Sequence, residues 1–202
     1  MTKQSAEKRD DDGGIALTDG AADVAAVRGV QSVKTLESLP SGCDIDLLSC
    51  GTFRFQTLDA ARQLASMLSN ACPEPAKVIV GMTELMVNAV EHGNLEISYD
   101  EKTRLYETDS WEQELRRRLS ATPYSDRYVE VRFERSPQRI QVTITDQGKG
   151  FDWRQFLEID PERMLHRHGR GIAMSRLISF DFVEYRGRGN EVSVGIDLVN
   201  AE

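Results

Sequence analysis

Hydrophobic residues recur along the chain at two spacings, and these spacings define the elements that the sequence predicts. Alternating apolar and polar positions predict strands over residues 52–55, 128–134, 139–145, 182–185 and 191–198. Apolar residues three and four apart predict helices over residues 58–68, from 74–75 to 92, and over 171–179. Gly93 then lies just past the end of the second helix. This order predicts an α/β two-layer sandwich, with helices on one face of a mixed, mostly antiparallel sheet.

Two stretches do not follow this pattern. Residues 1–50 carry nine acidic and five basic side chains and show no sustained period before Val24. We therefore expect residues 1–39 to form a mobile acidic tail, with a short helix near residues 24–36, and residues 40–202 to form the folded domain. Residues 95–127 are a charge-rich insertion with one helical face formed by Trp111, Leu115 and Leu119. The insertion is either a partner-recognition element anchored by Trp111 or a helix that covers the edge of the sheet.

Composition narrows the possible functions. The 202 residues are 40% hydrophobic and 29% charged, which is typical of a globular domain. The net charge of −8 argues against a protein that wraps a nucleic-acid backbone. The longest uncharged run, residues 63–73, is too short to span a bilayer, and the polar first 14 residues do not resemble a signal peptide. We expect a cytoplasmic protein.

The cysteines do not indicate a metal or disulfide site. Cys43, Cys50 and Cys72 are odd in number and form no CxxC pair. We interpret them as small reduced side chains packed near the first helix.

The second helix places several polar residues on one side. Glu84 and Asn88 are one turn apart, and Glu91 and His92 fall within the same sector at 100° per residue. A carboxylate can take a proton from an attacking hydroxyl, and an amide oxygen suits a hard cation such as Mg²⁺. The same spacing also fits a plain solvated face, so the helix alone does not decide between the two.

Two glycine loops favour a nucleotide site. The strand over residues 139–145 runs into Asp146, Gly148 and Gly150, where a carboxylate could read an amino group while glycines let the backbone approach a ligand. Residues 166–171 open the third helix with alternating glycines, and backbone N–H groups at a helix start bind phosphate. Neither loop is a dinucleotide fingerprint, and the chain has no GxxxxGK[ST] motif, which excludes a P-loop NTPase.

A helix with Glu and Asn followed by two glycine loops resembles the Bergerat-fold ATPases, the superfamily of gyrase, Hsp90, histidine kinases and MutL. Residues 83–94 are similar to the N box of the anti-sigma factor serine/threonine kinases, residues 146–152 to their G1 box, and residues 169–174 to their G2 box. Residues 189–192 occupy the place of the final Gly-Thr motif, with Asn190 and Glu191 as departures from it. The resemblance covers residues 52–198 and implies the Bergerat ATP-binding fold.

The resemblance also implies roles for individual residues. Glu84 would be the base that accepts the proton of a partner serine, and Asn88 would hold Mg²⁺ at the phosphates of ATP. Asp146 would accept from the adenine amino group. The remaining cofactor-binding candidates lie in the three motifs: His92 in the N box, Gly148 and Gly150 in the G1 box, and Arg167, Gly169, Arg170 and Gly171 at the G2 box. Most of the catalytic effect would come from positioning and charge neutralisation.

These roles predict an ATP-dependent serine/threonine kinase of the anti-sigma factor type. Its partners would be a STAS-type antagonist and a sigma factor, and family members are often homodimers. The alternative is an ATP-gated binding module that sequesters a partner without phosphate transfer. The catalytic half of a histidine kinase does not fit, because all three histidines lie inside the nucleotide motifs. A gyrase-like or MutL-like DNA machine does not fit either, because this chain lacks the basic surface that such a protein needs.

Overall fold

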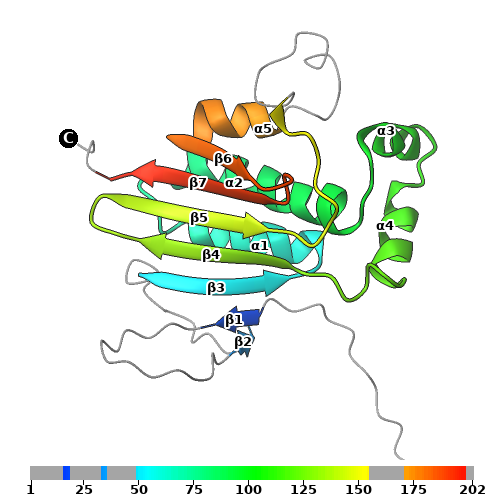
Figure 1. The fold of residues 1–202 in the computed structure, drawn as a ribbon, viewed down its shortest axis with the longest axis horizontal. Coiled ribbons are helices and arrows are strands. Elements are labelled where there is room, and N and C mark those ends of the chain that lie inside the picture. The colour runs from blue at the N-terminus through cyan, green and yellow to red at the C-terminus, as the bar shows by residue number, and fades with distance from the viewer. Residues whose placement is uncertain (1–15, 19–32, 36–48, 155–170, 199–202) are drawn as a thin grey trace, which may run out of the picture.

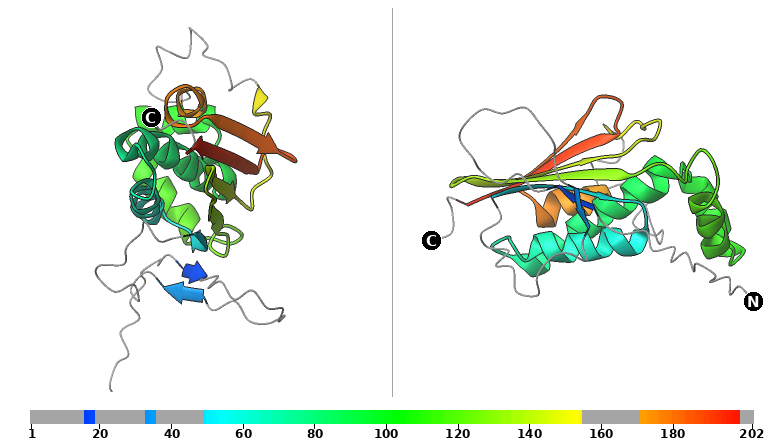
Figure 2. Two further views of the ribbon diagram at one scale, coloured as in Figure 1. Left: turned by 90° about the vertical axis from the view of Figure 1, so that its left-hand side faces the viewer. Right: turned by 90° about the horizontal axis from the view of Figure 1, so that it is seen from below.

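A single antiparallel sheet forms one layer of the protein, and helices cover one face of it (Figure 1, Figure 2). The computed structural model describes residues 16–18, 33–35, 49–154 and 171–198. Within these ranges the strand order is β2-β1-β3-β4-β5-β7-β6, and each neighbouring pair is antiparallel. The two-layer α/β sandwich is thus confirmed. The sheet is antiparallel rather than mixed, because β7 lies between β5 and β6, and β1 between β2 and β3, so that strands running in the same direction are never neighbours in the described ranges.

The elements follow the predicted order closely. The strands are β1 (Ala16–Thr18), β2 (Val33–Thr35), β3 (Cys50–Phe55), β4 (Val129–Arg135), β5 (Arg139–Thr145), β6 (Phe182–Arg186) and β7 (Glu191–Asp197). The helical elements are α1 (Leu58–Ser69), α2 (Pro75–Asn88), η3 (Ala89–Asn94), α3 (Tyr99–Glu107), α4 (Trp111–Leu119), α5 (Gly171–Met174) and η6 (Ser175–Ser179), where η3 and η6 are π-helical turns.

Local sequence explains where the main helices begin and which faces they bury. The Thr57 hydroxyl caps α1 by accepting the Ala60 N–H at 3.2 Å, and Pro75 occupies the first turn of α2, where its missing N–H costs nothing. Leu64 and Leu68 of α1 then face the sheet together with Met82 and other apolar residues of α2.

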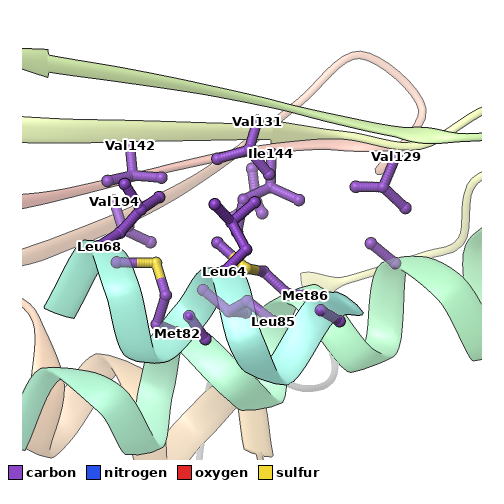
Figure 3. Close-up of a cluster of buried hydrophobic side chains, with 14 of the residues drawn as sticks. Leu64, Leu68, Met82, Leu85, Met86, Val129, Val131, Val142, Ile144 and Val194 are labelled. Carbon is purple, nitrogen blue, oxygen red and sulfur yellow. The ribbon is translucent and has the colours of Figure 1, made fainter. Parts of the chain in front are cut away.

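The core lies between these two helices and the strands. Valine and isoleucine side chains of β4, β5 and β7 point at the helices, and the whole set is buried (Figure 3). Members drawn there are Leu64, Leu68, Met82, Leu85, Met86, Val129, Val131, Val142, Ile144 and Val194. Alternate residues of β4 and β5 point away from the core, as the period of two requires. This packing fixes α2 against the sheet, and α2 carries the candidate site.

The second helix ends differently from the prediction. The chain continues beyond Asn88 as the π-helical turn η3, which includes His92 and Gly93 and ends at Asn94. Gly93 is therefore inside a helical element rather than just past it. π-helical turns within helices are frequently found at functional sites, and this one brings Gly93 next to the Asp146 carboxylate.

The segment before β3 also differs from the prediction. Residues 33–35 form β2, which pairs with β1, and β1 pairs with residues 52–54 of β3. The predicted helix over residues 24–36 is thus wrong at residues 33–35, while residues 24–32 and 36 lie outside the described ranges. The proposed boundary between tail and domain at residue 39 stays a prediction.

Cys72 is buried beside α1, and burial raises the pKa of its thiol to about 11, as expected for a reduced packed side chain. Cys43 lies outside the described residues.

The insertion forms two helices, α3 and α4, which stand beside one end of the sheet (Figure 1). Trp111 is half-buried, packs against the core cluster and stacks on Tyr106 with ring centroids 5.6 Å apart. This arrangement favours the packing interpretation over an exposed Trp111 anchor.

Within the described ranges, no helix combines the length and apolar character needed to cross a bilayer.

Candidate functional site

Glu84 and Gly171, two of the candidates expected near the phosphates, meet where α2 passes the start of α5. Glu84 is exposed on α2, and Asn88, half-buried, is the last residue of the same helix, one turn further on. A Cβ placed on Gly171 would contact the Glu84 carboxylate, with its Cδ only 3.1 Å away. The glycine thus lets the first turn of α5 lie directly against this acid.

Hydroxyl groups hold α2 and η6 together beside this contact. The Gly81 N–H donates to the Ser179 hydroxyl at 3.1 Å, and that hydroxyl donates to the Lys77 carbonyl at 2.8 Å. A side chain on Gly81 would clash with Ser179 and Phe180. The close approach of the two elements therefore depends on Gly81, and it sets the distance between Glu84 and the start of α5.

The second group of candidates surrounds Asp146, directly after β5. Its carboxylate fits against Gly93, where an added Cβ would lie 2.7 Å from both carboxylate oxygens. Gly148 donates its N–H to one of these oxygens at 2.8 Å, and a Cβ on Gly148 would collide with the Gly93 carbonyl. Both glycines are therefore required by close packing of the loop on η3, whereas the predicted approach of Gly148 to a ligand stays a prediction.

Asp146 is also held in place by the turn that precedes β7. Its N–H donates to the Asn190 carbonyl at 3.0 Å, and the Asn190 side-chain amide donates to the Asp146 carbonyl at 3.1 Å. Burial raises the pKa of Asp146 to about 6, against the opposing effects of the Gly148 N–H and the charges of Arg188 and Arg127. A half-buried carboxylate with one oxygen bonded to a backbone N–H is suited to accept a hydrogen bond from an amino group of a ligand.

Aromatic rings extend from the loop toward β6. The Tyr185 ring is buried, stacks on Trp153 with centroids 5.7 Å apart, and meets Phe151 edge-on at 5.5 Å. Burial raises the pKa of Tyr185, and the nearby Asp146 charge raises it further. Gly150 adopts φ +77°, and its tight approach to the Arg188 carbonyl leaves no room for a side chain. This explains the predicted need for glycine at position 150.

His92 has a structural contact in this arrangement. Its Nδ1 lies 2.5 Å from the Ile97 carbonyl. Burial lowers the pKa of His92, and the bond to Ile97 opposes this less strongly, so the ring is neutral at pH 7 and Nδ1–H is the donor. The bond ties η3 to the start of the insertion. A role of His92 in nucleotide binding stays a prediction.

Glu91 does not lie on the exposed polar face where the spacing of 100° per residue placed it. It is 2% exposed and pairs with Lys102 of α3, which is also buried. The prediction assumed a regular α-helix with solvent on the side of Glu84. The chain instead becomes π-helical after Asn88, and the insertion covers Glu91. Glu91 therefore does not share the exposure of Glu84.

Three further candidates, Arg167, Gly169 and Arg170, lie outside the described residues. In the part of the chain that the structure describes, no group of three or more His, Cys, Asp or Glu side chains could hold a metal ion. Asn88 would thus bind a cation only together with oxygens of a ligand and of water, the usual arrangement for Mg²⁺ beside phosphates.

Sequence reasoning missed the residues that brace the Asp146 loop, namely Asn94, Gln147 and Asn190. Asn94 and Gln147 lie within the N and G1 boxes, and Asn190 departs from the Gly-Thr motif, but none of the three was assigned a role. A position in a motif gives no information about which neighbour a side chain bonds.

A comparison with protein families agrees with this geometry. The model of the histidine kinase-like ATPase domain matches residues 54–196, which include both groups of site residues. No curated protein matches the chain.

Proposed function

Because the chain belongs to the histidine kinase-like ATPase domain family, we propose that it is an ATP-dependent serine/threonine protein kinase of the anti-sigma factor type. Its substrate would be a serine of a STAS-type antagonist protein in a bacterial partner-switching pathway, and a sigma factor would be the second partner. A homodimer is part of the same proposal.

The Asp146 end of the site is proposed to hold adenine. The carboxylate would accept the 6-amino group of the base, since one of its oxygens already accepts the Gly148 N–H and the aromatic rings of Phe151 and Tyr185 lie close by. The missing Cβ atoms of Gly93 and Gly148 make the space in which this carboxylate lies. A carboxylate acceptor in this position fits the amino group of an adenine base.

The α5 end of the site is proposed to hold the phosphates. Gly171 opens α5 against Glu84, and the resemblance assigns Arg167, Gly169 and Arg170 to the same end. Asn88 would hold Mg²⁺, which when bound would neutralise phosphate charge. His92, neutral and bonded to Ile97, would act by fixing the shape of η3.

The observation that carries the kinase proposal is the position of Glu84. It is an exposed acid placed at the start of α5, on the same helix as Asn88. In the reaction, the serine oxygen forms a bond to the γ-phosphorus while the bond from that phosphorus to the bridging oxygen breaks and ADP leaves. Glu84 takes the hydroxyl proton, and a positioned base typically contributes about 10²–10⁴-fold to the rate.

The test compares Glu84→Gln with wild type in single-turnover transfer of the γ-phosphoryl group to STAS-type candidates. Glu84→Gln keeps size and hydrogen bonding, so we expect unchanged Mg-ATP binding, unchanged partner binding and transfer slowed by at least about 10²-fold. Glu112→Gln, an exposed acid on α4, is the matched control and should transfer normally.

Transfer by Glu84→Gln at the wild-type rate would show that Glu84 is only a surface acid. A wild type that binds ATP tightly yet phosphorylates no candidate would instead favour the ATP-gated binding module.

A further inference from the structure

Asn94 is the last residue of η3, and its side chain is an unusual one for a protein interior. The residue is 2% exposed, and its Nδ2 has no hydrogen-bond partner within the described ranges. A buried donor without a partner costs stability. Such a cost is often found where a residue serves function rather than stability.

The other end of the Asn94 amide contacts the loop that follows β5. Its Oδ1 accepts the Gln147 N–H at 2.8 Å, and Gln147 directly follows Asp146. The next residue, Gly148, donates its N–H to the Asp146 carboxylate. The backbone of the loop is thus fixed by Asn94 at the residue next to the acid proposed to read adenine.

The main chain of Asn94 is bonded to the insertion. Arg127, just before β4, donates to the Asn94 carbonyl at 2.7 Å and to the Glu96 carboxylate at 2.9 Å. Glu96 adopts φ +53°, an uncommon conformation for a residue with a side chain, and its pKa is lowered because hydrogen bonds from Lys149 and Arg127 outweigh the effect of burial.

The Lys149 bond adds little to this link, since that side chain is 82% exposed and exposed ion pairs are weak. A second link joins the same elements, because the Gln147 side chain accepts the Tyr128 N–H at 2.9 Å. Asn94 and Arg127 therefore connect the insertion to the Asp146 loop through short, partly buried bonds.

We propose that Asn94 is a positioning residue for base recognition, which holds the Asp146 loop in register with η3 and, through Arg127, makes that register depend on the insertion. The inference rests on the proposed function, because it assumes that Asp146 reads the adenine amino group. Its specific content is that Asn94 acts on selectivity for the base and not on stability.

The test uses Asn94→Leu in the full chain, with calorimetric affinities for ATP and for ITP, which has a carbonyl in place of the 6-amino group. The variant removes the unpartnered donor of Asn94 together with the acceptor of the Gln147 N–H, whose hydrogen bond is only partly buried. We expect an unchanged or raised melting temperature and a preference for ATP over ITP reduced roughly 2- to 30-fold.

Two further variants sharpen the result. Ser193→Ala removes a buried hydroxyl of β7 that lies 3.1 Å from the Thr143 hydroxyl, and it should leave the preference for ATP unchanged whatever it does to the melting temperature. Arg127→Met should reduce the preference as Asn94→Leu does. A wild-type preference with Arg127→Met would remove the insertion from the proposal.

The outcomes separate this inference from the proposed function. A wild type that binds neither nucleotide would end the ATP-site proposal itself. A wild type that prefers ATP, with Asn94→Leu retaining that preference, would overturn the role of Asn94 alone. Equal weakening of ATP and ITP by Asn94→Leu with a lowered melting temperature would mean that the residue is only structural.

Discussion

Lys102 of α3 offers a direct test of whether the insertion is part of the domain. Its ammonium group pairs with the Glu91 carboxylate of η3, and the two side chains are only 11% and 3% exposed. Replacing Lys102 by methionine would leave Glu91 buried without its cation. Removal of one partner of a buried pair typically costs about 3–5 kcal/mol. For a domain of this size, that cost lowers the melting temperature by roughly 6–20 °C.

The effect can be separated from loss of side-chain packing. In the double variant Glu91→Met with Lys102→Met, both charges are absent, and replacement of a buried pair by apolar groups is often neutral or stabilising. We therefore expect the double variant to recover most of the lost stability. Lys77→Met removes the lysine of an exposed pair with Glu74 and should change stability far less.

The assay is thermal and urea unfolding followed by circular dichroism, with tryptophan fluorescence as a second probe. If Lys102→Met melts no lower than Lys77→Met, the pair does not fasten α3 to η3, and the insertion would be better described as a separate arm. If the double variant is as unstable as Lys102→Met, the loss arises from packing rather than from the unpaired charge.

Three other expectations follow from the structure. Burial disfavours the ionised form of Asp146 and raises its pKa to about 6. ADP affinity measured by calorimetry should therefore rise as pH increases through 6 and level off above 7, and Asp146→Asn should abolish this pH dependence. Gly93→Ala would push a methyl group into the Asp146 carboxylate, and we expect ADP to bind at least about tenfold more weakly, because a charge-assisted bond of roughly 1.5–3 kcal/mol is lost. Wild-type affinity of this variant for ADP would contradict the close contact. Deleting residues 1–39 removes β1 and β2 and uncovers the edge of β3, so sedimentation should detect more self-association at unchanged ADP affinity, and a monomer that no longer binds ADP would refute this.

Local sequence determined much of the architecture. The alternation in β4 and β5, the apolar stripes of α1 and α2, the cap at Thr57 and the proline at position 75 are all consequences of nearest neighbours along the chain. The order of the motifs determined which family the chain belongs to. These features were predictable because helix and strand periods depend on residues only a few positions apart.

Contacts between distant segments decided the rest. Glu84 meets Gly171 because α2 packs beside α5 and η6, and Asp146 fits against Gly93 because the loop after β5 folds onto η3. The burial of Glu91 and the bond from Gln147 to Asn94 depend on where the insertion and the loop fold back. The raised pKa of Asp146 is caused by the same burial. None of these could be predicted from periodicity, because desolvation and hydrogen bonding depend on residues tens of positions away, which only the folded chain brings together.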